Sequence, residues 1–189
     1  WFAQRGLEWI VLETGLGGRL DATNAITPVV SVITPIGWDH MQILGDTLAK
    51  IASEKAGIIK PDVPFVTQTQ DHEALDVLIT TAREKHAPLM LVTEPCELPL
   101  GLSGPHQRWN AALALAALRA AGLDLPAKVL EEGLKQVEWP ARFQRLRADV
   151  ILDGAHNLDA ARVLAQTWRE QFPHQKATIV FGAVAGKDI

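Results

Sequence analysis

Short runs of apolar residues alternate with longer amphipathic stretches through the first half of the chain. A short apolar run rich in branched side chains is typical of a buried strand, whereas apolar residues that recur every three or four positions are typical of a helix. Strands are predicted at residues 9–12, 29–33, 64–67 and 89–92, and helices at residues 46–57 and 71–86. Because strands that alternate with helices pair in parallel, we expect an α/β fold with a doubly wound, mostly parallel sheet.

The pattern changes after the fourth predicted strand. A loop rich in Pro and Gly leads to two more predicted helices, and a second strand–helix–strand pattern follows a break at residues 139–143. The loop lies at residues 95–105, the helices at 106–121 and 127–137, and the second pattern at 150–152, 158–171 and 177–181. This arrangement predicts a partial central domain at residues 1–141, an interdomain linker at 142–148 and the start of a second α/β domain at 149–189.

Composition and charge narrow the class of protein. Of the 189 residues, 48% are apolar and 21% are charged, which is ordinary for a globular protein, and the net charge of −4 argues against a nucleic-acid surface. No apolar run approaches the ~20 residues that cross a bilayer. The lone cysteine, Cys96, excludes an internal disulfide and is typical of a reducing compartment. We therefore expect a cytoplasmic protein that binds neither nucleic acid nor membrane. Since the chain opens without Met, we also expect an internal fragment.

A glycine-rich stretch at residues 12–24 follows the first predicted strand. Glu13 ends that strand, and Gly15, Gly17 and Gly18 come directly after it. Ligands of open α/β sheets bind just beyond the carboxyl ends of the strands, glycine lets the backbone approach a ligand, and Mg²⁺ prefers oxygen ligands such as a carboxylate. The stretch has neither the dinucleotide G-x-G-x-x-G spacing nor that of a phosphate loop, so a glycine-rich turn with a solvated glutamate is the alternative.

Asp39 and His40 follow the second predicted strand, at the edge of the sheet where Glu13 is also expected. Glu13 and His40 are therefore candidate ligands of one divalent cation, although a lone loop histidine is more often a hydrogen-bonded surface residue. Lys55 follows Glu54 near the end of the next predicted helix. A solvated Glu–Lys pair is the simpler interpretation, and a lysine that points into the same site, as a charge partner or a modified ligand, is the alternative.

Four polar residues in the second half are candidates for nucleotide contacts. Asn110 lies inside a predicted helix, where Asn is unfavourable unless its amide has a partner, and an adenine edge offers both a donor and an acceptor. Asp153 ends a predicted strand, where acidic residues of nucleotide folds bind ribose hydroxyls, and His156 follows it. Arg142 in the predicted linker can contact a phosphate when two domains close. Local capping or surface pairing is the alternative for Asn110, Arg142 and Asp153.

Five sequence strings occur in a fixed order along the chain. They are ETGLGGRLDATN at residues 13–24, DH at 39–40 with LG at 44–45, EKAGIIK at 54–60, HQ at 106–107 with NAA at 110–112, and DGAHN at 153–157. Together they closely resemble the folylpolyglutamate synthase/dihydrofolate synthase family, bacterial bifunctional type, of the Mur ligase superfamily. The resemblance runs through essentially the whole chain and implies a Mur-ligase-type ATP-binding central domain followed by the start of a C-terminal domain.

The resemblance implies an ATP-dependent acid–amino-acid ligase that uses Mg²⁺ and is expected to be a monomer. ATP phosphorylates a carboxylate of dihydropteroate or of a folate in such enzymes, and the amine of L-glutamate then displaces phosphate from the acyl phosphate. Glu13 and His40 are expected to ligate Mg²⁺, and Lys55 matches a lysine that is carbamylated in this family and so becomes an anionic oxygen ligand. By the same resemblance, Lys55 and His40 are the catalytic candidates, Asn110, Arg142, Asp153 and His156 are ATP contacts, and Arg19 and Asp21 are substrate contacts.

The chain also departs from the family pattern. The family's phosphate loop, a G-x-x-G-K-[ST]-type string, does not occur in the sequence, and Leu158 replaces the proline that usually follows the His-Asn pair. We therefore expect that the chain does not turn over by itself. Three alternatives remain: a Mur-type ligase acting on a cell-wall precursor, a metal-dependent hydrolase built on Glu13, Asp39 and His40, and a non-catalytic nucleotide- or folate-binding module. The Gly-Gly-Arg-Leu-Asp string favours the folate branch, and the hydrolase lacks a His-rich ligand set.

Overall fold

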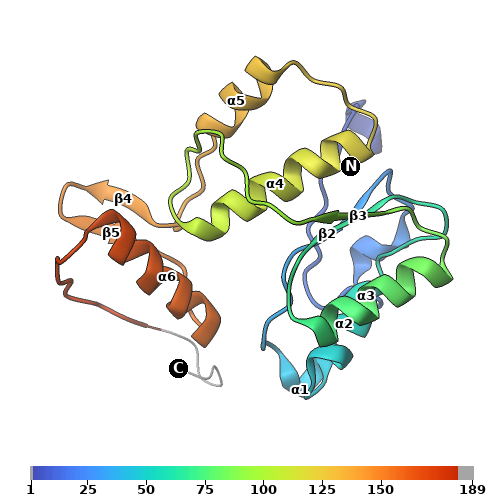
Figure 1. The fold of residues 1–189 in the computed structure, drawn as a ribbon, viewed down its shortest axis with the longest axis horizontal. Coiled ribbons are helices and arrows are strands. Elements are labelled where there is room, and N and C mark those ends of the chain that lie inside the picture. The colour runs from blue at the N-terminus through green and yellow to red at the C-terminus, as the bar shows by residue number, and fades with distance from the viewer. Residues whose placement is uncertain (1, 183–189) are drawn as a thin grey trace.

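A computed structural model describes residues 2–182 and contains a three-stranded parallel sheet (Figure 1). The strands are β1 (Ser31–Ile33), β2 (Phe65–Gln68) and β3 (Leu89–Val92), in the order β1-β2-β3. In the central strand, Phe65 is paired with Ser31 on one side and with Leu89 on the other. The predicted α/β class with parallel strands is confirmed.

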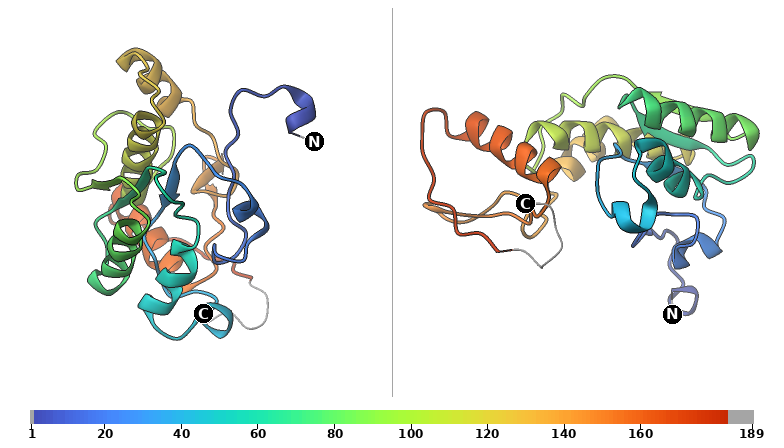
Figure 2. Two further views of the ribbon diagram at one scale, coloured as in Figure 1. Left: turned by 90° about the vertical axis from the view of Figure 1, so that its right-hand side faces the viewer. Right: turned by 90° about the horizontal axis from the view of Figure 1, so that it is seen from below.

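Helices cover both faces of this sheet (Figures 1 and 2). The helices α2 (Leu48–Ala56) and α3 (His72–Glu84) connect consecutive strands and pack on one face, in a core that includes the fully buried Phe65. The helix α4 (Pro105–Ala120) lies on the other face, where Leu113 packs with Val66. Because successive residues of a strand point to opposite faces, Phe65 and Val66 contribute to two separate cores.

Side-chain caps set the starts of the helices. The Thr47 hydroxyl accepts a hydrogen bond from the backbone N–H of Lys50 at 3.1 Å and begins α2, which ends before Gly57. Asp71 caps α3 in the same way through the backbone N–H of Glu73. Such caps satisfy N–H groups that the first helical turn leaves without a partner. The predicted helix at residues 46–57 is therefore confirmed; of Asp46 and Thr47, the two residues that the sequence offered as its cap, the structure uses Thr47.

A smaller part of the molecule follows α4 and the amphipathic helix α5 (Ala127–Lys135). It contains the antiparallel hairpin of β4 (Gln144–Arg147) and β5 (Val150–Leu152) and the helix α6 (Leu158–Gln171), which lie at the opposite end from α2 and α3 (Figure 2). The strand β4 was not predicted, and it falls inside the stretch expected to be a linker. The division of the chain into two domains stays a prediction.

Two of the strand predictions are wrong. Residues 9–12 and 177–181 have no strand structure and are exposed, with Val11 and Val180 both 98% exposed. An apolar run becomes a strand only beside another strand, and within residues 2–182 no strand pairs with either run. Two short helices were also not predicted: the 3₁₀ turn η2 (Ala22–Ala25) and α1 (Met41–Leu44). Helical structure was expected at the start of the sequence, where the structure has the 3₁₀ turn η1 (Ala3–Arg5). None of the described helices has the length and apolar character needed to cross a membrane.

Candidate functional site

The glycine-rich stretch docks on the C-terminal end of α2. The backbone N–H of Arg19 donates to the carbonyl of Glu54 at 2.8 Å, and Asn24 donates through its amide to the carbonyl of Gly57 at 3.1 Å. A Cβ on Gly18 would lie 2.7 Å from the carbonyl oxygen of Lys55, and one on Gly57 would lie 2.4 Å from the Cα of Arg19. Glycine is required at both places because the two backbones are in contact.

Asp21 holds the turn of this glycine-rich stretch. One carboxylate oxygen accepts hydrogen bonds from the backbone N–H groups of Gly15 and Leu16, at 3.0 and 3.1 Å. The other accepts from the backbone N–H and the hydroxyl of Thr23, at 2.9 and 2.6 Å. These bonds, led by the one from the Thr23 hydroxyl, lower the pKa of Asp21 to about 2. Asp21 was predicted to contact the substrate, and the structure shows that it organises the loop; the substrate contact stays a prediction.

Arg19, the other expected substrate contact, forms an ion pair with Glu54. Its guanidinium donates to the Glu54 carboxylate through Nη2 at 2.9 Å and through Nε at 3.2 Å, and this pairing raises the pKa of Arg19. One of the two interpretations of the sequence made Glu54 the partner of Lys55. The structure pairs it with Arg19 instead, so Lys55 is left to face a different group.

A cavity of about 220 Å³, here called the glycine-loop pocket, lies beside this docked stretch. It is lined by residues 14–17 of the glycine-rich stretch and by Asp39, His40 and Lys55. Burial lowers the pKa of Lys55, and the nearby carboxylate of Asp39 opposes that effect only in part. The pocket therefore brings together His40 and Lys55, two of the three predicted metal ligands, with an amine that is more easily deprotonated than an ordinary lysine.

Glu13, the third predicted ligand, is exposed and does not line the glycine-loop pocket, although the next residue, Thr14, does. Within residues 2–182 no three His, Cys, Asp or Glu side chains are grouped as a metal ion requires. The donor set of the pocket is thus one carboxylate and one imidazole. It fits Mg²⁺ when Lys55 is a carbamate that adds oxygen ligands, and it does not fit Mg²⁺ when Lys55 is an amine.

Asp39 links this pocket to the smaller part of the molecule. One carboxylate oxygen accepts the backbone N–H of His40 at 2.9 Å, and the other accepts the amide of Asn157 at 3.1 Å. The carbonyl oxygen of the same Asn157 side chain caps α6 through the backbone N–H of Ala160. Close by, a Cβ on Gly37 would meet the Asp159 carboxylate at 2.5 Å. The loop after β1 and the start of α6 are therefore in direct contact.

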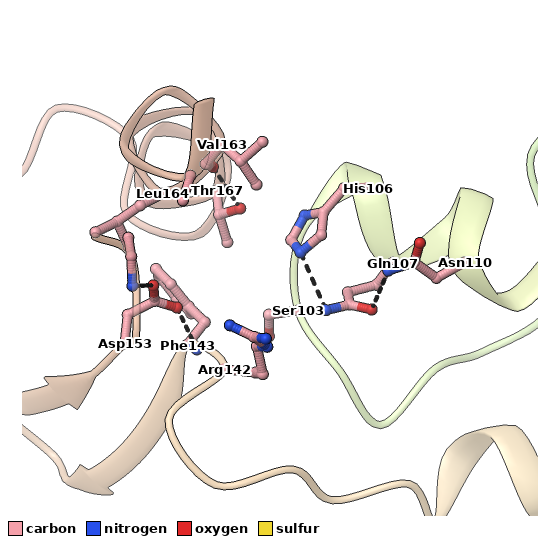
Figure 3. Close-up of a pocket in the computed structure, with 12 residues that line it drawn as sticks. Ser103, His106, Gln107, Asn110, Arg142, Phe143, Asp153, Val163, Leu164 and Thr167 are labelled. Carbon is pink, nitrogen blue, oxygen red and sulfur yellow. Dashed lines mark hydrogen bonds between the residues drawn. The ribbon is translucent and has the colours of Figure 1, made fainter. Parts of the chain in front are cut away.

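A second cavity, of about 260 Å³, lies between α4, α6 and the turn that carries Arg142 (Figure 3). This α4–α6 pocket is lined by Asn110, Arg142 and Asp153, three of the four residues predicted to contact ATP. Val163 and Leu164 supply an apolar wall. The fourth predicted residue, His156, is exposed outside the cavity, with its ring Nδ1 at 2.8 Å from the carbonyl oxygen of Gly154.

A directed chain of hydrogen bonds crosses the α4 side of this pocket. The Asn110 amide donates to the Gln107 carbonyl oxygen at 3.1 Å, and the Gln107 amide then donates to His106 Nε2 at 3.0 Å. A neutral His106 that accepts at Nε2 carries its proton on Nδ1, and this buried Nδ1 has no partner within residues 2–182. Burial lowers the pKa of His106 and favours this neutral form. A ligand with an acceptor atom would satisfy the orphaned N–H.

Sequence reasoning assigned no role to His106 or Gln107, which line the pocket beside Asn110. The signal was present, since both belong to the HQ string used for the family resemblance. Thr167 also lines the cavity and is only 1% exposed. The sequence did not mark Thr167 as a pocket residue, because a helical threonine that faces a pocket and one that faces the core occur in the same sequence pattern.

Comparison with known proteins gives consistent matches. No family model matches the sequence. The chain is 37% identical to dihydrofolate synthase/folylpolyglutamate synthase of Bacillus subtilis, over 96% of this chain and 49% of that protein. It is 30% identical to folylpolyglutamate synthase of Lacticaseibacillus casei, over 100% of this chain and 51% of that protein. The chain thus spans about half the length of these relatives.

Solved structures agree with these sequence matches. A folylpolyglutamate synthase complex with AMPPCP and folate matches with a TM-score of 0.85 at 29% identity, over 92% of this chain and 50% of that one. Folylpolyglutamate synthase of Mycobacterium tuberculosis, complexed with ADP, matches with a TM-score of 0.83 at 35% identity, over 90% and 45%. The fold is therefore the α/β fold of Mur-type ligases. More narrowly, the chain belongs to the folylpolyglutamate synthase/dihydrofolate synthase family, as its motifs implied.

Proposed function

We propose that the chain is the nucleotide- and metal-binding part of an ATP-dependent ligase that adds L-glutamate to dihydropteroate or to folate polyglutamate tails. One observation carries this proposal: the α4–α6 pocket brings together Asn110, Arg142 and Asp153 from three separate segments. Its volume, apolar wall and convergent polar groups suit a small ligand, and the orphaned N–H of His106 suits one with acceptor atoms. Related proteins with this fold bind AMPPCP, folate and ADP.

In the proposed reaction the γ-phosphoryl group of ATP is transferred to a substrate carboxylate, which gives an acyl phosphate and ADP. The amine of L-glutamate attacks the acyl carbon, loses a proton and displaces inorganic phosphate. Little covalent chemistry is left to the protein, so positioning and charge neutralisation dominate. Arg142 is an exposed residue that lines the α4–α6 pocket, and its guanidinium is suited to hold a phosphate.

Mg²⁺ would neutralise phosphate charge in the glycine-loop pocket, where we assign it to His40 and a carbamylated Lys55, with Glu13 as the third predicted ligand. The lowered pKa of Lys55 supports the carbamate, because only the neutral amine adds CO₂ and the step releases one proton. Asp39 also faces the pocket and is a further oxygen donor. The carbamate is tested by intact-mass measurement in bicarbonate, where we expect one added CO₂ that Lys55→Arg abolishes.

Several features of the full protein belong to the same proposal. We infer a central domain at residues 1–141, a linker at 142–148 and a second domain from residue 149, a monomer in the cytoplasm, and small-molecule substrates only. His156 remains a proposed ATP contact and Arg19 and Asp21 proposed substrate contacts. The two pockets support a ligase more than a zinc hydrolase, because within residues 2–182 no histidine-rich ligand group is present.

The nucleotide site is tested by titrating the 189-residue chain with MgATP and following heat or intrinsic Trp fluorescence. We expect saturable binding that Arg142→Ala weakens about tenfold, equivalent to about 1.4 kcal/mol. The matched control is Arg119→Ala, which removes an exposed arginine from the last turn of α4 and should leave the affinity unchanged. Absence of any nucleotide binding by the wild-type chain would contradict the assignment.

Substrate class is tested with the same chain by comparing dihydropteroate and tetrahydrofolate with UDP-muramoyl peptides as ligands. Preferential binding of the folate compounds is expected, and preference for the muramoyl compounds would favour a cell-wall ligase. With ATP, L-glutamate and dihydropteroate together, we expect no release of ADP, because the chain contains no G-x-x-G-K-[ST] string. Robust ADP release would overturn that last expectation.

A further inference from the structure

The backbone on either side of Arg142 is held in an unusual conformation. Ala141 has φ = 58° and Phe143 has φ = 49°, which places two side chains in the left-handed region that favours glycine. Such residues persist only where the surrounding contacts determine them, and they cluster at functional sites. Elsewhere in the described chain, Asp62 and His86 have the same conformation and line neither pocket, so the chain contains natural controls.

Besides the bond from the backbone N–H of Arg142 to the carbonyl of Trp139 at 3.3 Å, three hydrogen bonds fix the turn. The backbone N–H of Ala141 donates to the Gln144 side chain at 3.0 Å, and the carbonyl of Ala141 accepts the backbone N–H of Gly154 at 2.8 Å. The backbone N–H of Phe143 donates to one carboxylate oxygen of Asp153 at 2.8 Å. Each of these three bonds ties one end of the turn to the β4–β5 hairpin or to the loop that follows it.

The Asp153 carboxylate connects the loop that follows β5 with the turn of residues 141–143. Its other carboxylate oxygen accepts the backbone N–H of Ala155 at 2.8 Å, so both oxygens are engaged with the backbone. The Phe143 ring completes the support, since it is 9% exposed and packs against Trp168 and Phe172 with ring centroids 6.4 and 6.3 Å apart. Both flanking residues of Arg142 are thus anchored while Arg142 itself projects into the α4–α6 pocket (Figure 3).

We propose that the strained turn of residues 141–143, bracketed by the Asp153 carboxylate, pre-orients the Arg142 guanidinium toward the phosphates of a bound nucleotide. Ala141 and Asp153 are then positioning residues that act through Arg142. The inference rests on the proposed nucleotide site and adds how the protein orients Arg142 within that site. A glycine at position 141 would populate several backbone conformations, whereas alanine populates fewer. The strained turn lowers the stability of the fold, and in return it restricts Arg142 to a narrower set of orientations.

The test compares Ala141→Gly with Asp62→Gly, since both changes relieve the same left-handed conformation. Each variant should melt about 2–4 °C higher than the wild-type chain, the shift expected for a change of this kind in a chain of this size. Only Ala141→Gly should lose MgATP affinity, by about three- to tenfold. Adenosine, which has no phosphate for Arg142, should bind equally to the wild type and both variants. General damage to the pocket would weaken adenosine as well and would overturn the proposal, as would an unchanged ATP affinity.

A second readout needs no nucleotide. The Nε–Hε group of Arg142, followed by NMR in arginine-labelled protein, should report restricted motion in the wild type and in Asp62→Gly, and averaged motion in Ala141→Gly. Failure of the wild-type chain to bind ATP and adenosine would refute the nucleotide site, whereas the Arg142 signal would still decide whether the turn orders that side chain. An Arg142 side chain equally mobile in all three proteins would refute the inference alone.

Discussion

The glycine-loop pocket and the α4–α6 pocket are built by different means. In the first, two backbones touch, and glycines at positions 18 and 57 leave room for the contact between the glycine-rich stretch and the end of α2. In the second, the Arg142 turn keeps full side chains at strained positions and depends on the Asp153 carboxylate to hold it. The first pocket is therefore sensitive to added volume, and the second to lost hydrogen bonds.

This difference says how each pocket responds to change. Where backbones are in contact, one added methyl group has no space, and the loop and helix must separate. Where a carboxylate brackets a turn, removing one bond leaves the others in place, and the response is graded. We therefore expect abrupt losses from substitutions around the glycine-loop pocket and moderate ones around the α4–α6 pocket.

The largest effect is expected from Gly57→Ala. Its new methyl group would lie 2.4 Å from the Cα of Arg19, so the glycine-rich stretch must leave α2, and we expect a loss of about 3 kcal/mol in the free energy of unfolding. Urea denaturation followed by circular dichroism measures it. The matched control is Gly133→Ala in α5, where a Cβ meets nothing within 4 Å and should add about 0.5–1 kcal/mol of stability. If Gly57→Ala and Gly133→Ala changed the free energy of unfolding equally, close contact between two backbones would not be what holds the glycine-loop pocket together.

An intermediate effect is expected where the two parts meet, at the hydrogen bond between Asp39 and Asn157. Asn157→Asp keeps the acceptor that caps α6 but sets a carboxylate against Asp39, and we expect a loss of about 1 kcal/mol. Combining it with Asp39→Asn exchanges donor and acceptor, so the double variant should recover most of that loss. A double-mutant cycle from chemical denaturation gives the coupling, and purely additive effects would show that the bond contributes nothing.

The smallest effect is expected from acid acting on Asp21. Its pKa is about 2 in the folded chain against an ordinary value of 3.8, so the carboxylate contributes stability above about pH 4 that is lost as the pH falls toward 2. The difference in melting temperature between the wild type and Asp21→Asn should shrink over that range. Thr23→Val removes the hydroxyl that lowers the pKa most, and an NMR titration should find the Asp21 midpoint closer to 3.8. An unmoved midpoint would refute this account.

Local signals in the sequence were sufficient for much of the fold. Asp46 or Thr47 was the expected cap of α2 and Gly57 its expected end, and the structure has Thr47 as the cap; a cap and a stop act within one helical turn and are therefore visible in the local sequence. The apolar runs at residues 9–12 and 177–181 failed as strands because a strand also needs a neighbour, which no local pattern supplies. The β4 strand was missed for the opposite reason: its residues 144–147 are largely polar and exposed, and pairing with β5 alone defines it.

The candidate sites show the same limit. Residue types and their positions made His40 a candidate for one pocket and Asn110, Arg142 and Asp153 candidates for the other, whereas Lys55 was assigned to the first pocket only through the family resemblance. Partners distant in sequence were not predictable: the Glu54 that pairs with Arg19 lies 35 residues away. The backbone conformation of the Arg142 turn was also not predictable from the sequence, because neither alanine nor phenylalanine favours the left-handed conformation that Ala141 and Phe143 have.

Asn157 has a consequence for how the two pockets communicate. Its planar amide donates to Asp39 with one end and starts α6 with the other, so the two ends must move together. Asp39 is also the carboxylate that favours the charged form of Lys55. A displacement of α6 when its pocket fills should therefore change the electrostatic potential at the Lys55 amine. Asn157 would in this way transmit a movement of α6 to the glycine-loop pocket.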